Sequence, residues 1–179
     1  MPTINTLSAR EIIDSRGTPT IEVSCTLSTG EQGIASIPSG ASTGVHEVYE
    51  LRDGDSNRFG GKGVLKAVAH VEEEIAHALC EKEWTQTTLD EALITLDGTD
   101  NKSRLGANAI LGVSIAFAKA SAQSQNKRLY EYVGELAGDT LYQIPTPAFN
   151  IINGGKHADS GLDRSEEHTS ELQSRSAIS

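Results

Sequence analysis

TIEVSCTL, residues Thr20–Leu27, alternates apolar and polar side chains along the chain. Its apolar residues Ile21, Val23 and Cys25 lie two positions apart, and polar residues stand between them. Successive side chains of an extended strand point to opposite faces, so this spacing is typical of a strand with one buried face. We therefore predict a half-buried antiparallel sheet built around this segment.

Two more strand-like runs flank this segment. TINTLSAREII (Thr3–Ile13) precedes it across the turn-rich DSRGTPT, and QGIASI (Gln32–Ile37) follows it after STGE. Both connections are short, and short connections join antiparallel neighbours. The sequence thus predicts a three-stranded antiparallel meander.

Helical patterns follow the strands. The first spans Val64–Leu79, a shorter one Thr88–Leu96, an Ala- and Gly-rich one Ala107–Gln125, and a fourth Leu129–Ala137, with Gly138 as a C-terminal stop. The apolar residues of the first share one helical face: Val64, Leu65, Val68, Val71, Ile75 and Leu79. Strands followed by helices, without alternation, indicate an α+β fold with a helical bundle after the meander.

We expect three parts in the chain. Residues 1–138 form the α+β domain, 139–163 begin a second domain, and 164–179 form a polar tail without an apolar period. In the second part, the apolar run Ala148–Ile152 indicates a buried strand. It is followed by Asn-Gly-Gly, which suits the first strand of a barrel with a functional loop at its end. The tail is expected to be disordered.

Composition restricts the possible partners. The formal net charge of −10 disfavours nucleic acid and anionic membranes, and an acidic protein that handles an anionic metabolite needs local positive charge, such as a divalent cation. Cys25 and Cys80 stand alone, which indicates buried thiols in a reducing compartment. No signal peptide and no apolar run of about 20 residues is present, so we expect a cytoplasmic protein.

PSGASTGVHE (Pro38–Glu47) is rich in glycine and hydroxyl residues. Composition alone leaves two interpretations open, a surface loop and a mobile flap that closes over a charged ligand. A Walker A loop is excluded, because no Lys-Ser or Lys-Thr pair follows the glycines. His46, His70 and His77 lack metal-ligand partners at useful spacing, so we interpret them as structural or solvent-facing.

Six stretches, taken together and in order, resemble the enolase family over Ile4–Asp163. They read AREIIDSRGTPTIEV, PSGASTGVHE, ELRDGD, GKGVLKAV, LDGTDNKSRLGANAILGVSIAFAKA and PTPAFNIINGGKHAD. The resemblance implies an N-terminal α+β domain followed by an enolase-type α/β barrel. It also implies a homodimeric lyase of glycolysis, phosphopyruvate hydratase, which dehydrates 2-phosphoglycerate to phosphoenolpyruvate with Mg²⁺.

The resemblance also implies roles for particular residues. Ser39 aligns with the serine that binds the second magnesium through its hydroxyl and carbonyl oxygens, and His157 aligns with the substrate-contacting histidine of a second flap. By itself, a histidine in a Gly-rich loop is usually solvated. We interpret the neighbouring Lys156 as a solvated side chain. The remaining residues of the first flap are Gly40, Ala41, Ser42, Thr43 and Gly44.

Three charged residues each keep two interpretations. Arg16 either braces the flap electrostatically or stabilises its own turn. Arg10 and Glu22 align with family positions at the homodimer interface, and the alternative for both is a solvated sheet face.

The resemblance stops after Asp163, where family members continue with a segment close to IQEF. Here RSEEHTSELQS (Arg164–Ser174) resembles the translation of a sequencing-library adapter, and a natural polar tail is the alternative. The family's lysine base, glutamate acid and first-magnesium carboxylates lie on later barrel strands. The resemblance therefore assigns no proton-transfer group to residues 1–179. We expect a fragment of the lyase that is inactive by itself. The alternatives are a non-catalytic folding or interaction fragment and an unrelated anion binder with a Gly-rich loop.

Overall fold

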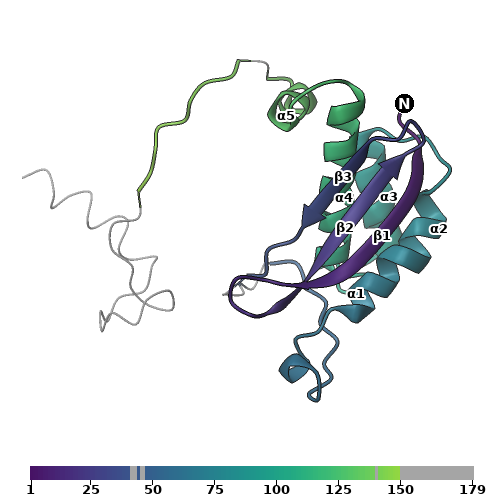
Figure 1. The fold of residues 1–179 in the computed structure, drawn as a ribbon, viewed down its shortest axis with the longest axis vertical. Coiled ribbons are helices and arrows are strands. Elements are labelled where there is room, and N and C mark those ends of the chain that lie inside the picture. The colour runs from purple at the N-terminus through teal and green to yellow at the C-terminus, as the bar shows by residue number, and fades with distance from the viewer. Residues whose placement is uncertain (41–43, 45–46, 140, 150–179) are drawn as a thin grey trace, which may run out of the picture. The chain divides into compact units, whose positions relative to one another are not determined.

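The structure is a computed structural model that describes residues 1–40, 44, 47–139 and 141–149 (Figure 1). The chain divides into two compact units, Met1–Leu141 and Tyr142–Ser179. All helices and strands of the described residues belong to the first unit.

Three strands form the predicted antiparallel meander: β1 (Ile4–Ile13), β2 (Pro19–Leu27) and β3 (Gln32–Ser36), in the order β1-β2-β3. The alternation in β2 determines which face is buried. Ile21, Val23 and Cys25 are completely buried, as the sequence predicts. The register places Val23 opposite Ala9 on one side and Ala35 on the other, so one apolar face runs across all three strands.

The helical part follows as η1 (Phe59–Gly61), α1 (Leu65–His70), η2 (Val71–Ile75), α2 (Ala76–Leu79), α3 (Gln86–Asp97), α4 (Ala107–Ser124) and α5 (Leu129–Ala137). Fold class α+β is confirmed, with a sheet followed by helices. Helix α5 has the predicted bounds, and Gly138 ends it in a left-handed conformation. Helix α3 begins two residues before its predicted start, because the Thr85 hydroxyl caps it by accepting from the Thr88 N–H.

The helix predicted over Val64–Leu79 is interrupted by one π-helical turn, η2, between α1 and α2. Both ends of that turn, Val71 and Ile75, are completely buried, so the wider turn keeps two apolar side chains on the core. One predicted core position is wrong. Leu65 is 48% exposed, because Val64 and Ala67, on either side of it, are the residues that face the core at the start of the helix.

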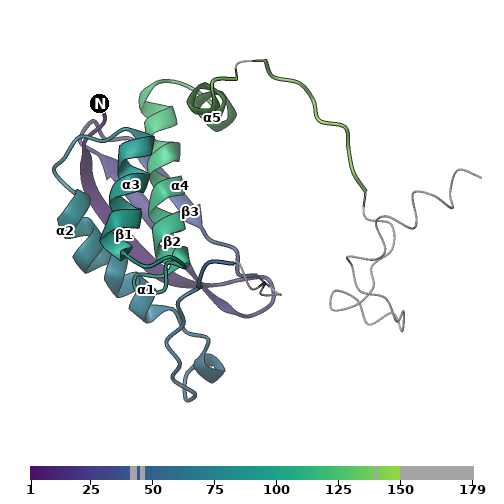
Figure 2. The ribbon, with the colours of Figure 1, turned by 180° about the vertical axis from the view of Figure 1, so that it is seen from behind.

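Among the described residues, the helices cover one face of the sheet, as Figure 2 shows with the helices on the near side. Helix α4 packs on β2 and β3, whereas α1, η2 and α2 pack on β1. Helix α4 approaches the sheet closely at Gly112, where an added Cβ would lie 2.5 Å from Val23 Cγ2. At Gly33 it would lie 2.0 Å from the Ala116 carbonyl oxygen, so the backbones of β3 and α4 almost touch.

In the second unit, Tyr142–Phe149 form neither helix nor strand. Of the run predicted as a barrel strand, only Ala148 and Phe149 are described, and Phe149 is 80% exposed. No helix among the described residues has the length and apolar character needed to cross a bilayer.

Candidate functional site around Ser39

Ser39 lies in the loop after β3, and both of its oxygens are engaged. Its carbonyl oxygen accepts a hydrogen bond from Arg16 Nη2 at 2.5 Å. Its hydroxyl accepts from Arg52 Nη2 at 2.7 Å and donates to Glu50 Oε2 at 3.1 Å. Segments far apart in the sequence therefore meet at this serine.

Arg52 is the centre of this arrangement. Its Nη1 donates to the carbonyl oxygens of Pro19 and Lys62, both at 2.6 Å, and its Nη2 lies 2.7 Å from Glu50 Oε1. The side chain is only 19% exposed, so these charge-assisted bonds are partly shielded from water. One guanidinium thus joins the start of β2, the loop after β3 and the loop before α1.

Helix α4 fixes the position of Glu50 and Arg52. Between them, Leu51 packs against the core, and its backbone N–H and carbonyl each bond to the Asn108 side-chain amide at 3.1 Å. Alternate residues of an extended chain point the same way, so Glu50 and Arg52 both face Ser39 when Leu51 faces inward. The first turn of α4 therefore orients the site.

Arg16 contacts both its own turn and Ser39. It stabilises its own turn, where Asp14 Oδ1 accepts from the backbone N–H groups of Thr18 at 2.8 Å and Arg16 at 2.9 Å. These bonds, with that from Thr18 foremost, hold the pKa of Asp14 below its ordinary value. The Arg16 guanidinium also donates to the Ser39 carbonyl oxygen, so the turn and the start of the flap are connected.

A cavity of about 450 Å³ opens beside Ser39. Its walls carry three cationic side chains and one carboxylate: they are formed by Arg16, Thr18, Ser39, Gly40, Glu50, Arg52 and Lys62. A second cavity, of about 590 Å³, adjoins it and shares Gly40, Glu50 and Arg52. The flap residues Gly40 and Gly44 both line this second cavity, together with Tyr49.

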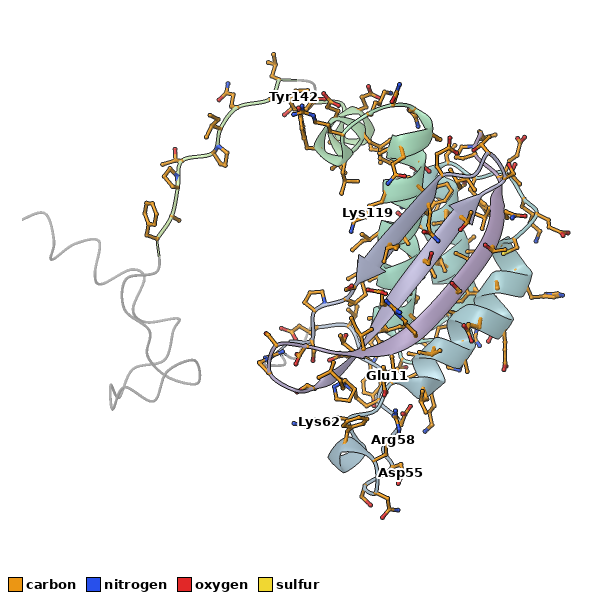
Figure 3. All side chains as sticks on the ribbon, in the orientation of Figure 1. Glu11, Asp55, Arg58, Lys62, Lys119 and Tyr142 are labelled. Atoms are coloured by element: carbon orange, nitrogen blue, oxygen red, sulfur yellow. The ribbon has the colours of Figure 1, made fainter. Side chains whose placement is uncertain are left out.

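An ion-paired cluster anchors the loop that carries Lys62. The Glu11 carboxylate accepts from the Arg58 guanidinium and, at 2.8 Å, from the Val64 N–H (Figure 3). The bond from Arg58 is the main reason that the pKa of Glu11 lies below its ordinary value. Asp53 binds the N–H groups of the first residues of α1 and also faces Arg58, at 3.6 Å.

The oxygen chemistry at Ser39 suits a hard cation such as Mg²⁺, which prefers hydroxyl, carbonyl and carboxylate ligands. Ser39 supplies the first two, and the Glu50 carboxylate lies against its hydroxyl. However, Arg16 and Arg52 donate to the same two serine oxygens. They would have to withdraw before a cation could use both. Within residues 1–40, 44, 47–139 and 141–149, no three His, Cys, Asp or Glu side chains are grouped as metal ligands.

Several predicted site residues lie outside the described residues. They are Ala41, Ser42, Thr43, His46, Lys156 and His157, and their roles stay predictions. His70 has a structural partner, since its Nδ1 lies 3.0 Å from the Leu105 carbonyl oxygen. Glu50 and Arg52 received no role from the sequence. The signal that could have found them is their i, i+2 spacing around an apolar residue.

Arg10 and Glu22 form an ion pair with each other, at 2.6 Å, on the sheet face that the helices leave uncovered. Arg10 is 74% exposed, whereas Glu22 is 19% exposed and also accepts from the Ser36 hydroxyl at 2.9 Å. The sheet face is thus polar and accessible within this unit. Whether a second copy contacts it stays a prediction.

Comparison with protein families gives one match. The model of the enolase N-terminal domain matches residues 4–133, which include the sheet, α1 to α4, the Ser39 loop and the beginning of α5.

Proposed function

This chain belongs to the enolase family, and on that premise we propose that it supplies the N-terminal domain and first flap of a lyase. The proposed reaction is the reversible, magnesium-dependent dehydration of 2-phosphoglycerate to phosphoenolpyruvate in glycolysis. The observation that carries the proposal is the convergence of Arg16, Glu50 and Arg52 on Ser39. This convergence positions the residue that the resemblance assigns to the metal. We also propose that the protein is located in the cytoplasm.

In this proposal Ser39 would hold the second Mg²⁺ through its hydroxyl and carbonyl oxygens. The reaction removes a weakly acidic proton next to a carboxylate, and Mg²⁺ supplies positive charge where negative charge develops, a general pattern of enolase-superfamily sites. The part played by this chain is orientation. Arg52 and Glu50 hold the hydroxyl of Ser39 and Arg16 holds its carbonyl until Mg²⁺ binds, when Arg16 and Arg52 would have to withdraw. Flap closure would exclude water.

We further propose that residues 1–179 alone do not catalyse this reaction. The resemblance assigns the base, the acid and the first-magnesium carboxylates to later strands, and general acid–base steps typically contribute about 10²–10⁴-fold each. The alternative is that the 179-residue chain is a non-catalytic folding or interaction fragment. A purified 179-residue chain, free of host enolase, should give no phosphoenolpyruvate absorbance with excess Mg²⁺. Activity that co-purifies with the chain would contradict this proposal.

The genomic DNA beyond codon 163 tests the lyase proposal. An open frame that continues into IQEF-like sequence would be expressed in full and assayed with and without Mg²⁺. We expect magnesium-dependent phosphoenolpyruvate formation, and Ser39→Ala should raise the Mg²⁺ concentration needed for half-maximal rate. An inactive full-length protein would contradict the lyase proposal. An unchanged magnesium dependence in Ser39→Ala would contradict the assignment of Ser39 to the metal.

We also propose that the polar face of the sheet contacts a second copy of the full-length protein, as the family's homodimer implies. Charge reversal at Glu22 would break the pair with Arg10 and repel a matching partner. Sedimentation of full-length Glu22→Lys should therefore show more monomer than the wild type at equal concentration. An unchanged distribution would remove this pair from the interface.

A further inference from the structure

Strand β3 lies at the edge of the sheet, and β2 is its hydrogen-bonded neighbour in the order β1-β2-β3. The Ile37 N–H donates to the Ile21 carbonyl oxygen at 3.0 Å. Bonded and unbonded pairs alternate along an antiparallel ladder, so Ala35 and Gly33, two and four positions earlier, also exchange hydrogen bonds with β2. The backbone N–H and carbonyl groups of the residues between these positions therefore point away from β2, and they belong to Gln32, Ile34 and Ser36.

A lysine from α4 covers the middle of this outer edge. The Lys119 ammonium donates to the Ile34 carbonyl oxygen at 2.7 Å, and Figure 3 shows Lys119 at the side of β3 that is turned away from β2. The close packing of α4 on β3 makes this bond possible, since a Cβ added at Gly33 would lie 2.9 Å from the Lys119 Cβ. The lysine stem thus starts beside the strand, and its charge ends at the central outward carbonyl.

The sequence of β3 itself does not discourage pairing. QGIAS contains neither a proline nor a charged side chain, which are two of the devices that keep edge strands of proteins apart. Ile34, at the centre of the strand, is 45% exposed. An edge strand of this kind offers its outward N–H and carbonyl groups to another strand, unless a neighbouring group blocks them.

We infer that the outer edge of β3 is a pairing surface for β3 of a second copy of this chain, and that Lys119 keeps this surface closed. Antiparallel pairing about a two-fold axis at Ile34 is self-complementary. Each Ile34 N–H would donate to the Ile34 carbonyl of the other copy. Gln32 of one copy would lie opposite Ser36 of the other, so no charged side chains of the two strands would meet.

Lys119 opposes this pairing in two ways. Its ammonium occupies the Ile34 carbonyl oxygen that the N–H of the second copy would need. In a symmetric pair the two ammonium groups would also lie close to each other, and like charges repel. The inference does not depend on the proposed reaction. The edge is also distinct from the sheet face that carries the Arg10–Glu22 pair.

Amide hydrogen exchange of the 179-residue chain tests the inference at the residue concerned. The Ile34 N–H points outward, so in the wild type we expect its exchange rate to be independent of protein concentration. Lys119→Met removes both the charge and the donor. In this variant, exchange at Ile34 should slow as the concentration rises, by about tenfold once most chains are paired. The Ala35 N–H, which bonds to β2, should stay protected in both proteins and reports that the sheet is intact.

Lys82→Met is the matched control. Lys82 also donates to a backbone carbonyl, that of Ala78 at 2.7 Å, but it lies beside the start of β1, at the opposite edge of the sheet. This variant loses the same charge and gains the same side chain, so its exchange at Ile34 should match that of the wild type. Lys119→Arg, which keeps a cationic donor, should also behave like the wild type.

A second change separates edge pairing from association through another surface. Adding Ile34→Lys to Lys119→Met would place like charges directly opposite each other in the pair, so the concentration-dependent protection at position 34 should disappear. If Lys119→Met lost the native amide spectrum, Lys119→Gln would take its place. The inference would be overturned by exchange at Ile34 that ignores concentration in Lys119→Met, that slows equally in Lys82→Met, or that stays slow in the double variant.

Discussion

Arg52 Nη2 lies 2.7 Å from the hydroxyl oxygen of Ser39, the oxygen that the enolase resemblance assigns to a metal ion. A guanidinium and a divalent cation cannot both occupy the same side of one hydroxyl, since like charges repel at that distance. The position of Arg52 therefore decides what Ser39 can bind. Because Arg52 also ties Pro19 and Lys62 together, its removal should affect both the fold and the site.

Arg52→Lys should lower the free energy of unfolding by about 2–4 kcal/mol, because one ammonium cannot reach acceptors that a planar guanidinium joins. Urea unfolding followed by circular dichroism measures this change. Arg10→Lys is the matched control, because Arg10 is 74% exposed and pairs only with Glu22 among the described residues. Its effect should stay below about 1 kcal/mol. Equal effects of the two changes would contradict the central role of Arg52.

Glu11→Gln should cost about 1–3 kcal/mol at pH 7, because the carboxylate accepts from both Arg58 and the Val64 N–H. The pKa of Glu11 in the folded protein lies below its ordinary value of 4.5, so folding favours the ionised form. The stabilisation is fully present above pH 4.5 and is lost as the pH falls through the lowered pKa.

The difference between wild type and Glu11→Gln should accordingly be constant near neutral pH and disappear in acid. Unfolding curves at several pH values measure it, with the exposed Glu91→Gln on α3 as the control. A difference that grows on acidification would contradict the stabilising role of the ionised Glu11 carboxylate.

Gly33→Ala and Gly112→Ala should both destabilise the sheet–helix packing, but only one should be rescued. At Gly112 the added Cβ meets the Val23 side chain, so Val23→Ala should relieve the strain in a double-mutant cycle. At Gly33 the added Cβ meets backbone atoms of α4, which no substitution can remove. We expect about 3 kcal/mol or more for Gly33→Ala and no rescue by Val23→Ala. Similar rescue at both positions would contradict the packing described for β3.

The two thiols should differ in reactivity. Burial raises the pKa of the Cys25 thiol to about 12, and burial also raises the pKa of Cys80, which is only partly covered. Because the thiolate is the reactive form, iodoacetamide at pH 8 should modify Cys80 first. Cys25 should react only as the chain unfolds. Peptide mass mapping at timed intervals checks the order, and the reverse order would contradict the burial of β2.

Local patterns in the sequence were enough for the three strands and the main helices of the first unit. Alternation in Thr20–Leu27 identifies the central strand and its buried face, and the Ala- and Gly-rich run after Gly106 predicts a helix. The π-helical turn at Val71–Ile75 could not be predicted, since it contains neither proline nor glycine and its apolar spacing fits an ordinary helix.

The site was predicted less completely, because its contacts join distant segments. Ser39 was found through resemblance, and Arg16 through its position in the β1–β2 turn. Arg52 was missed. Its partners at positions 19, 39 and 62 carry no common motif, and a backbone carbonyl as acceptor leaves no trace in residue type.

The packing of α4 on β2 and β3 also determines when the domain can fold during synthesis. Ser124, the last residue of α4, follows the end of β3 at Ser36 by 88 residues. At about 5–20 residues per second, a ribosome needs roughly 4–18 s to make that stretch. Throughout this interval the apolar side chains of β2 and β3 have been made but lack their main cover. The nascent chain should therefore bind holding chaperones until α4 emerges, and their release should coincide with completion of that helix.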